Sequence, residues 1–386
     1  MATGAGDRYW EYQGLPSVLK HELLRRYLPI FAGKTGSKSA SVVYLDGYAG
    51  RGRYDNGAPG SAELILKVAE DYKERGISFR LFFHEKKRKN YAVLKPVVDE
   101  YKARGVQAEA SPEEVIKGLG RVIDAARGLP FFMFLDPCGV GMPFSELTKV
   151  LSGQRRDIWP PTEVLLNFSL EAVRRIGGHV NSDTPDEASM ALLDSALGSD
   201  WWRDVIRKRG VTDDAVREIV DGFMNRLAKA TKMRIVACPV SRAPSHKPVY
   251  YLVLGTRSPL GICYFGDSAA RAEEKWWDTL EAKEAAREED KGMDALFDAP
   301  YLSHPSLEEV EAEAVPVVAE NIFRLAEMHG QIKVGDYPGE VFGDYLGMVT
   351  EKVVRAAIKH LNANGRTPST GVGKKIPDLI VARQQR

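Results

Sequence analysis

The segment Ser41–Tyr54 constrains the fold most, because an apolar run there ends in an acid and then breaks into closely spaced glycines. The run has the composition of a buried strand, and Asp46 ends it. Glycine lets a backbone turn tightly and approach a ligand without a Cβ in the way. A stretch of helical period follows over residues 62–73, just behind Gly60 and Ser61. The order of strand, glycine loop and helix predicts a loop that cradles a nucleotide-type cofactor.

The glycine spacing distinguishes between two cofactor folds. Within Ser41–Tyr54 the only G-x-G, Gly50-Arg51-Gly52, comes four residues after Asp46, whereas dinucleotide folds use G-x-G-x-x-G. The pattern Asp-x-x-Ala-Gly-x-Gly is similar instead to motif I of class I S-adenosylmethionine-dependent methyltransferases. We expect Asp46 to orient the glycine loop or to hold the cofactor's amino group, and the alternative is a role confined to capping the loop. The similarity implies that the loop holds the methionine part of the cofactor through Asp46, Gly47, Tyr48, Ala49, Gly50, Gly52 and Arg53.

The first two thirds of the chain alternate between short apolar runs and stretches of helical period. Such alternation predicts an α/β fold with a buried parallel sheet. The last two runs have a short connection, which predicts an antiparallel pair at one sheet edge. A Rossmann-like, seven-stranded methyltransferase sheet needs that closing hairpin, whereas a dehydrogenase would more often have a sixth parallel strand. The predicted strands are Val42–Asp46, Phe79–Glu85, Val106–Ala110, Phe131–Asp136, Glu163–Phe168, Met233–Val240 and Val249–Gly255.

Pattern and composition predict four regions along the chain. An N-terminal helical lead covers residues 1–40, and the methyltransferase-like domain covers 41–268 with a helical insertion at 170–232. The insertion is either a lid or substrate platform, or a supporting layer whose tryptophans fill its own core. A charged helix and linker cover 269–314, and a winged-helix-like domain covers 315–386.

The last region differs in character from the sheet domain. Two helices with apolar stripes precede a loop over 367–375 rich in Gly, Ser and Thr, and a strand-like run follows over Asp378–Ala382. Residues 365–386 carry five bases against one acid, a local excess that suits nucleic acid. This order resembles a winged helix. The alternative is a small helical cap or a dimerisation element.

The charge and cysteine content limit the function classes. Because 54 basic side chains balance 53 acidic ones, the whole chain gives no electrostatic argument for nucleic acid or a membrane. The three cysteines lie far apart without C-x-x-C spacing, which speaks against a zinc site and favours a reducing cytoplasm. No run of 18 apolar residues occurs, and the N-terminus lacks the features of a signal peptide. We therefore expect a soluble, cytoplasmic protein with no metal and no membrane partner.

Two further strand ends carry candidate cofactor ligands. Glu85 ends the second predicted strand, where an acid in such folds takes both ribose hydroxyls. The alternative is a surface acid paired with the neighbouring basic residues. Glu109 and Ser111 lie after the third strand, where adenine contacts usually arise.

The fourth predicted strand delivers Asp136-Pro137-Cys138-Gly139 to the carboxyl edge of the sheet, where open α/β folds bind ligands. A carboxylate beside a proline-fixed turn can accept a hydrogen bond from an amine nucleophile. The alternative is an Asp-Pro turn with a structural role alone. The motif is similar to the Asp-Pro-Phe-Gly of tRNA guanine-N2 methyltransferases, and more loosely to the Asp-Pro-Pro-Tyr of adenine-N6 enzymes. Asn167 and Ser169 end the fifth strand and complete the polar lining. We expect Asp136, Pro137 and Asn167 to form the catalytic group, and Cys138 to be a buried small hydrophobe rather than a nucleophile.

With these motifs placed, the chain resembles the three-Cys-motif partner protein family. The resemblance rests on Lys20–Leu28, Asp46–Tyr54, Glu85, Asp136–Gly139 and Leu165–Ser169 in that order. It implies a class I methyltransferase-like fold and a partner protein of radical-enzyme type. The expected function is S-adenosylmethionine-dependent N-methylation of a nucleic-acid base amine, in RNA or DNA. The alternative is a non-catalytic or cofactor-sensing adaptor that serves a partner enzyme.

Overall fold

The structure is a computed structural model that describes residues 7–244, 246–290 and 304–384. Its contacts group the chain into two compact units. The first unit contains Met1–Pro16 and Leu28–Arg257, and the second contains Ser17–Tyr27 and Ser258–Arg386. Within the described residues, no helix is both long and apolar enough to cross a membrane.

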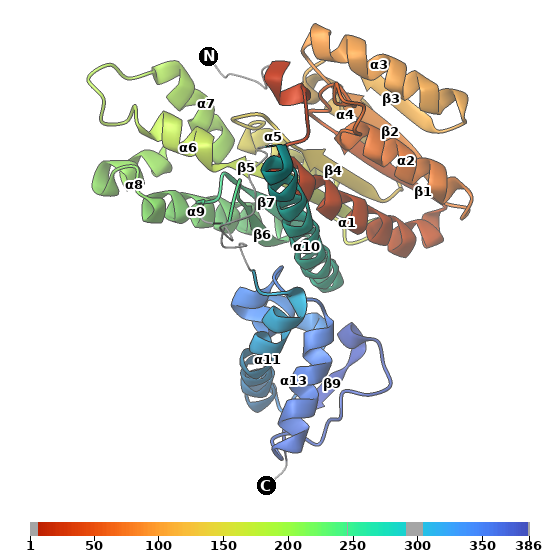
Figure 1. Ribbon diagram of the computed structural model, residues 1–386, viewed down its shortest axis with the longest axis vertical. Coiled ribbons are helices and arrows are strands. Elements are labelled where there is room, and N and C mark those ends of the chain that lie inside the picture. Colours follow the sequence, from red (N-terminus) through yellow and green to blue (C-terminus); the bar gives the residue numbers. More distant parts are fainter. Residues whose placement is uncertain (1–6, 245, 291–303, 385–386) are drawn as a thin grey trace. The chain divides into compact units, whose positions relative to one another are not determined.

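The first unit is built on one sheet of seven strands in the order β3-β2-β1-β4-β5-β7-β6 (Figure 1). Strands β1 to β5 run parallel, and β7 is antiparallel to both β5 and β6. This order confirms the predicted Rossmann-like, class I methyltransferase sheet with its closing hairpin. The strands are β1 Ser41–Asp46, β2 Ser78–His84, β3 Gln107–Ser111, β4 Phe131–Leu135, β5 Thr162–Ser169, β6 Arg234–Val240 and β7 Tyr250–Thr256.

The strand order places a switch point beside β1, whose two neighbours are β2 and β4. Chains that cross over on either side of such a point leave a crevice at the carboxyl ends of the strands. The glycine loop follows β1 at this edge. Helices connect the strands, namely α1 Leu15–Ser39, α2 Ser61–Lys73, α3 Arg88–Ala103, α4 Val115–Ala125 and α5 Phe144–Lys149.

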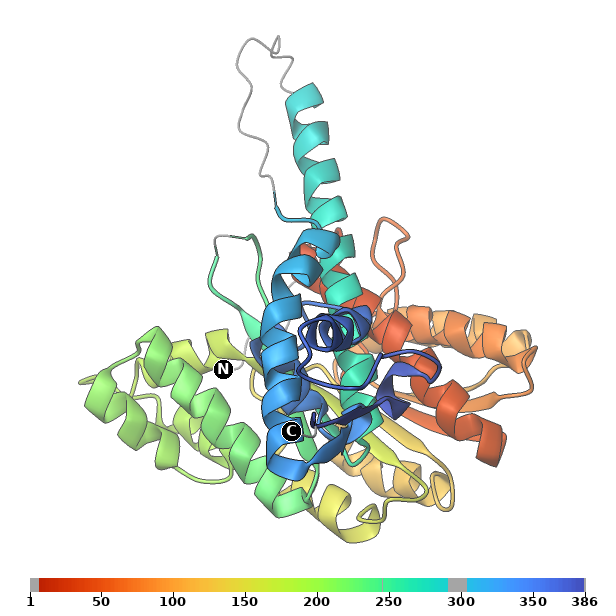
Figure 2. The same cartoon turned by 90° about the horizontal axis from the view of Figure 1, so that it is seen from below.

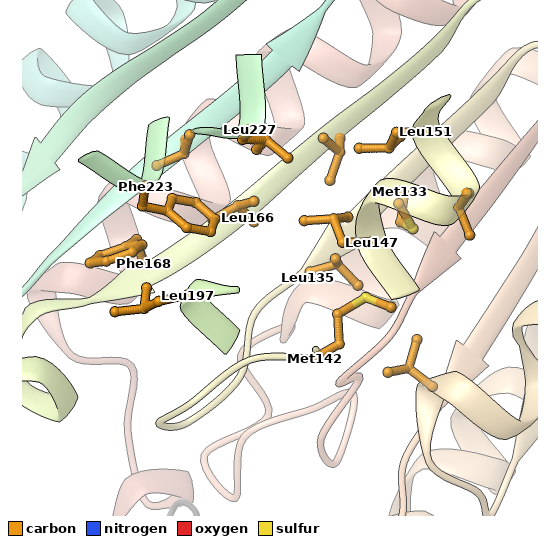
Figure 3. Close-up of a cluster of buried hydrophobic side chains, with 14 of the residues drawn as sticks. Met133, Leu135, Met142, Leu147, Leu151, Leu166, Phe168, Leu197, Phe223 and Leu227 are labelled. Atoms are coloured by element: carbon orange, nitrogen blue, oxygen red, sulfur yellow. The ribbon is translucent and has the colours of Figure 1, made fainter. Parts of the chain in front are cut away.

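The helical insertion packs on one face of the sheet rather than standing apart from it. Figure 3 shows Phe223 and Leu227 from the last insertion helix beside Leu166 of β5. Trp202 is fully buried in the same apolar cluster, as a supporting layer requires. The insertion helices are α6 Leu170–Gly177, α7 Glu187–Leu197, α8 Trp201–Arg209 and α9 Asp213–Thr231.

The second unit has its own apolar core, in which α11 and α13 pack side by side (Figures 1 and 2). The Ser306 hydroxyl accepts the backbone N–H of Glu309, and the Glu309 carboxylate accepts the backbone N–H of Ser306. The two bonds form a capping box at the start of α11. The order helix, strand, helix, helix, strand is that of a winged helix, but the winged-helix assignment stays a prediction. Residues 291–303 of the predicted linker lie outside the described residues. The elements are α10 Pro259–Asp290, α11 Leu307–His329, β8 Gln331–Lys333, α12 Pro338–Phe342, α13 Lys352–Ala363 and β9 Ile380–Ala382.

Candidate functional site

Asp46 holds the start of the glycine loop. Its carboxylate is fully buried at the end of β1. One oxygen accepts the backbone N–H of Tyr48 at 3.0 Å, and the other accepts the hydroxyl of Ser61 at 3.0 Å. Asp46 thus joins the loop to the first turn of α2. This is the loop-capping role, and a direct contact to the cofactor's amino group stays a prediction.

Two glycines of the loop have backbone conformations that other residues rarely adopt. Gly50 has φ +65° and Gly52 has φ +78°. A Cβ on Gly50 would lie 2.3 Å from the Trp10 ring, and the Gly52 carbonyl accepts the N–H of Gly60 at 2.8 Å. Glycine is therefore required at Gly50 by both conformation and space.

Glu85 lies just beyond β2, is 8% exposed, and joins the glycine loop to the end of the second strand. One carboxylate oxygen accepts the N–H of Gly50 at 3.0 Å, and the other accepts the N–H of Lys87 at 2.7 Å. Each carboxylate oxygen has two acceptor positions, so both oxygens keep capacity for a ribose hydroxyl. In this structure the Glu85 carboxylate therefore binds the backbone of the glycine loop.

The remaining predicted cofactor residues lie in the glycine loop or at the end of β3. Tyr48 and Ala49 lie in the loop, and the Ala49 N–H donates to the His84 carbonyl at 3.0 Å. Ser111 ends β3 and is buried, and its hydroxyl accepts from Arg121 at 2.9 Å. Gly47 is enclosed, because a Cβ there would lie 2.8 Å from a Leu135 methyl carbon.

The Arg53 guanidinium binds side chains of α2 and α3. Its guanidinium donates to both oxygens of Glu63 on α2, at 2.7 and 2.6 Å, and to Glu100 on α3 at 3.3 Å. The Glu63 hydrogen bonds raise the pKa of Arg53. Arg53 therefore braces the loop in this structure. Glu109 is likewise paired with Arg121, at 3.3 Å on the surface.

Asp136 and Asn167 meet at the carboxyl ends of β4 and β5. The strand register sets Leu135 opposite Leu166, so the next residues, Asp136 and Asn167, are neighbours. The Asn167 side-chain N–H donates to the Asp136 carboxylate at 2.7 Å. The Asn167 Oδ1 is buried and has no hydrogen-bond partner among the described residues.

Asp136 is also close to the glycine loop. The Gly47 N–H donates to the Phe134 carbonyl of β4 at 2.9 Å, which ties the start of the loop to the strand before Asp136. The charges of Asp46 and Asp136 both add to burial in raising the pKa of Tyr44. The two carboxylates therefore flank one buried side chain, at the same edge of the sheet.

A pocket opens beside Asn167 and encloses about 540 Å³, counting its solvent-facing mouth. Figure 3 shows much of its wall, with Leu135, Leu166 and Phe168 from the sheet opposite Leu197 and Phe223 from the insertion. Asn167 and Ser169 are the polar side chains of the lining among the described residues, and the Ser169 hydroxyl already accepts the Ala172 N–H at 3.1 Å. The full lining is Leu135, Pro137, Gly139, Val140, Gly141, Met142, Leu147, Leu166, Asn167, Phe168, Ser169, Ala172, Val173, Leu193, Ala196, Leu197 and Phe223.

Two sequence expectations at the site need correction or extension. Cys138 is exposed, so the expectation of a buried small hydrophobe was wrong. Strand β4 ends at Leu135, and beyond it Pro137 lines the pocket whereas Cys138 does not. Sequence reasoning also missed Trp10, whose ring packs against Gly50. The aromatic-rich run Tyr9-Trp10-Glu11-Tyr12 ahead of the first helix was the available signal.

Comparison with known proteins gives only distant likenesses. No protein-family model and no curated protein matches the chain. The solved structures include the methyltransferase domain of bacterial CtHen1-CN, at 8% identity, TM-score 0.29, covering 60% of this chain and 99% of that one. Coclaurine N-methyltransferase bound to N-methylheliamine and S-adenosylhomocysteine has 9% identity and TM-score 0.23, covering 59% and 70%. YjhP from E. coli has 11% identity and TM-score 0.23, covering 63% and 98%. At such scores these likenesses carry no argument about function, and the fold assignment rests on the strand order.

Proposed function

We propose that this protein is an S-adenosylmethionine-dependent methyltransferase acting on an amine nitrogen. The observation that carries the proposal is the hydrogen-bonded pair of Asp136 and Asn167 at the same sheet edge as the glycine loop, where Asn167 also lines an apolar pocket. Open α/β sheets bind their ligands at this edge. The strand order with its closing hairpin supports the same proposal.

The residues present fit the cofactor. Glu85 presents two carboxylate oxygens that can accept ribose hydroxyls beside the backbone of Gly50. Ser111 offers a buried hydroxyl at the next strand. When bound, S-adenosylmethionine supplies an electrophilic methyl group on a sulfonium. The chain's own task is to hold that group and to orient an acceptor.

Asp136 and Asn167 would orient the acceptor amine. The Asp136 carboxylate accepts one N–H of the amine, which directs the nitrogen lone pair away from the carboxylate. Asn167 fixes the carboxylate through its own N–H, while its buried Oδ1 accepts the second N–H of the amine. After transfer the nitrogen is positively charged, and the Asp136 carboxylate can take the proton that the product releases.

We further propose that the amine belongs to a nucleic-acid base. The Asp-Pro-Cys-Gly similarity supports this step, together with exposed lysines at 359, 374 and 375 in the second unit. The loop that carries two of these lysines is held to α13, because Arg355 donates to the carbonyls of Gly371 and Lys374. A base would have to leave its stack to reach the pocket, where its flat face would lie on apolar walls.

A second candidate is a non-catalytic adaptor of the three-Cys-motif partner kind that serves a radical-type enzyme. One observation favours it. The glycine loop is already completed by protein groups, since Asp46 and Glu85 bind its N–H groups without a ligand. A scaffold could keep such a loop for its shape alone.

Methyl transfer to pooled RNA and DNA separates these candidates. Incubation with methyl-labelled cofactor should label nucleic acid in the wild type, and Asp136→Ala should lose transfer by about a hundredfold or more. Glu146→Ala is the matched control, because this acid is paired with Lys149 on α5. Transfer that survives Asp136→Ala removes Asp136 from the mechanism, and label appearing only in small apolar amines would rule out the nucleic-acid substrate.

A further inference from the structure

The short N-terminal helix Asp7–Trp10 lies against the glycine loop. The Trp10 carbonyl accepts the N–H of Asp55 at 2.7 Å, and its ring lies 5.6 Å from the Tyr54 ring. These contacts hold Trp10 against the C-terminal end of the glycine loop, at Tyr54 and Asp55. Trp10 is 7% exposed, so the loop and the N-terminal segment bury it almost completely.

The indole N–H of Trp10 is a buried hydrogen-bond donor. Its Nε1 is buried, and no group in the described part of the chain accepts its hydrogen bond. Buried donors in proteins are nearly always paired, and an exception requires an explanation.

The place of Trp10 indicates which ligand group would pair with it. Gly50 separates Trp10 from Glu85, because the Gly50 N–H donates to Glu85 at 3.0 Å while its Cα faces the Trp10 ring. With the ribose at Glu85, the cofactor group nearest Trp10 belongs to the methionine part. The Arg51 guanidinium lies 5.6 Å from the Trp10 ring centre and is paired with Asp55 at 3.2 Å. In the methionine part the ammonium group only donates, so the carboxylate is the group that can accept the indole N–H, and an ionised acceptor forms the stronger hydrogen bond.

We propose that Trp10 binds the cofactor, with its indole N–H donating to the carboxylate of the methionine part. This rests on the proposed function, since it assumes the cofactor. The short helix Asp7–Trp10 thereby becomes part of the binding site.

Two ligands that differ in one group test this directly. S-adenosylhomocysteine and its decarboxylated form are titrated into the full chain by calorimetry, with Trp10→Phe beside the wild type. We expect Trp10→Phe to weaken S-adenosylhomocysteine by about tenfold to a hundredfold, as for a lost bond to a charged group, and to leave the decarboxylated ligand unchanged. Trp276→Phe is the matched control, because Trp276 also has a buried, unpartnered Nε1 in the described chain but lies in the second unit.

The outcomes separate this inference from the proposed function. Equal weakening of both ligands by Trp10→Phe, or weakening of neither, would overturn the role of the indole N–H while the cofactor assignment stood. Failure of the wild type to bind S-adenosylhomocysteine would overturn both. A second measurement uses only the wild type, so it does not depend on a variant that folds. In NMR spectra of protein labelled with ¹⁵N-tryptophan, the resonance of one indole proton should shift downfield with S-adenosylhomocysteine and stay in place with the decarboxylated ligand.

Discussion

The fit between Gly50 and Trp10 makes a quantitative prediction about stability. Gly50 and Gly57 both have positive φ, +65° and +83°. Alanine at either position should cost about 1–2 kcal/mol of unfolding free energy from the backbone conformation alone. They differ in space, because the new Cβ would lie 2.3 Å from Trp10 at Gly50, whereas no described atom outside the immediate chain neighbours lies within 4 Å at Gly57.

The clash adds the cost of overpacking, about 1–3 kcal/mol, because the buried Trp10 ring cannot move aside freely. Gly50→Ala should therefore destabilise the first unit by about 2–5 kcal/mol and Gly57→Ala by about 1–2 kcal/mol. Urea denaturation measures both. At an m-value of about 2 kcal/mol/M, the two midpoints should differ by roughly 0.5–1.5 M.

A double-mutant cycle isolates the contact. In a Trp10→Ala background the clash is gone, so Gly50→Ala should cost no more than Gly57→Ala, and the coupling energy should be about 1–3 kcal/mol. The reasoning is refuted if Gly50→Ala is as mild as Gly57→Ala in the wild-type background, because Trp10 would then not occupy the space above Gly50.

Two further predictions concern the second unit. Burial, and then the Lys20 charge, lower the pKa of His21 to about 3, so the folded state resists protonation that the unfolded state accepts near pH 6.5. Stability should be complete above pH 6.5 and fall as the pH drops toward 3, by up to about 2 kcal/mol at pH 5 from this residue. His21→Gln should reduce the loss between pH 7 and pH 5 in urea titrations, and an equal loss in the variant would contradict this origin. If the loop bearing Lys374 and Lys375 contacts phosphates, alanine at both should reduce the slope of log affinity against log salt by about 1.5. Alanine at the exposed lysines 102 and 208 is the control, and an unaltered slope in the loop variant would assign the loop to protein contacts.

Sequence predicted the sheet well because its central strands β1, β4 and β5 are largely buried on both faces. All five residues of β4 are buried, and such runs differ in composition from the helices between them. The sequence also predicted that Asp136 and Asn167 lie at the same edge of the sheet, because parallel strands have their carboxyl ends at one edge. The order β1-β4 then set the glycine loop beside them.

The rest of the site depends on contacts that no local pattern encodes. Arg53 belongs to the glycine motif, yet its guanidinium is held by Glu63 and Glu100 from two later helices. Trp10 precedes the first helix without any period, and its role depends on packing against a loop far along the chain. The exposure of Cys138 depends on the direction of the turn at Pro137, which the sequence does not specify.

The central claim is that the edge formed by Gly50 and Glu85 binds S-adenosylmethionine. Calorimetric titration with S-adenosylhomocysteine tests it most directly, with NAD as a control ligand, Glu85→Ala as the test variant, and Glu114→Ala, an exposed acid paired with Lys86, as the matched variant. We predict micromolar binding in the wild type and in Glu114→Ala, and loss of binding in Glu85→Ala. Absence of binding to the wild type, or binding that Glu85→Ala leaves intact, would contradict the account.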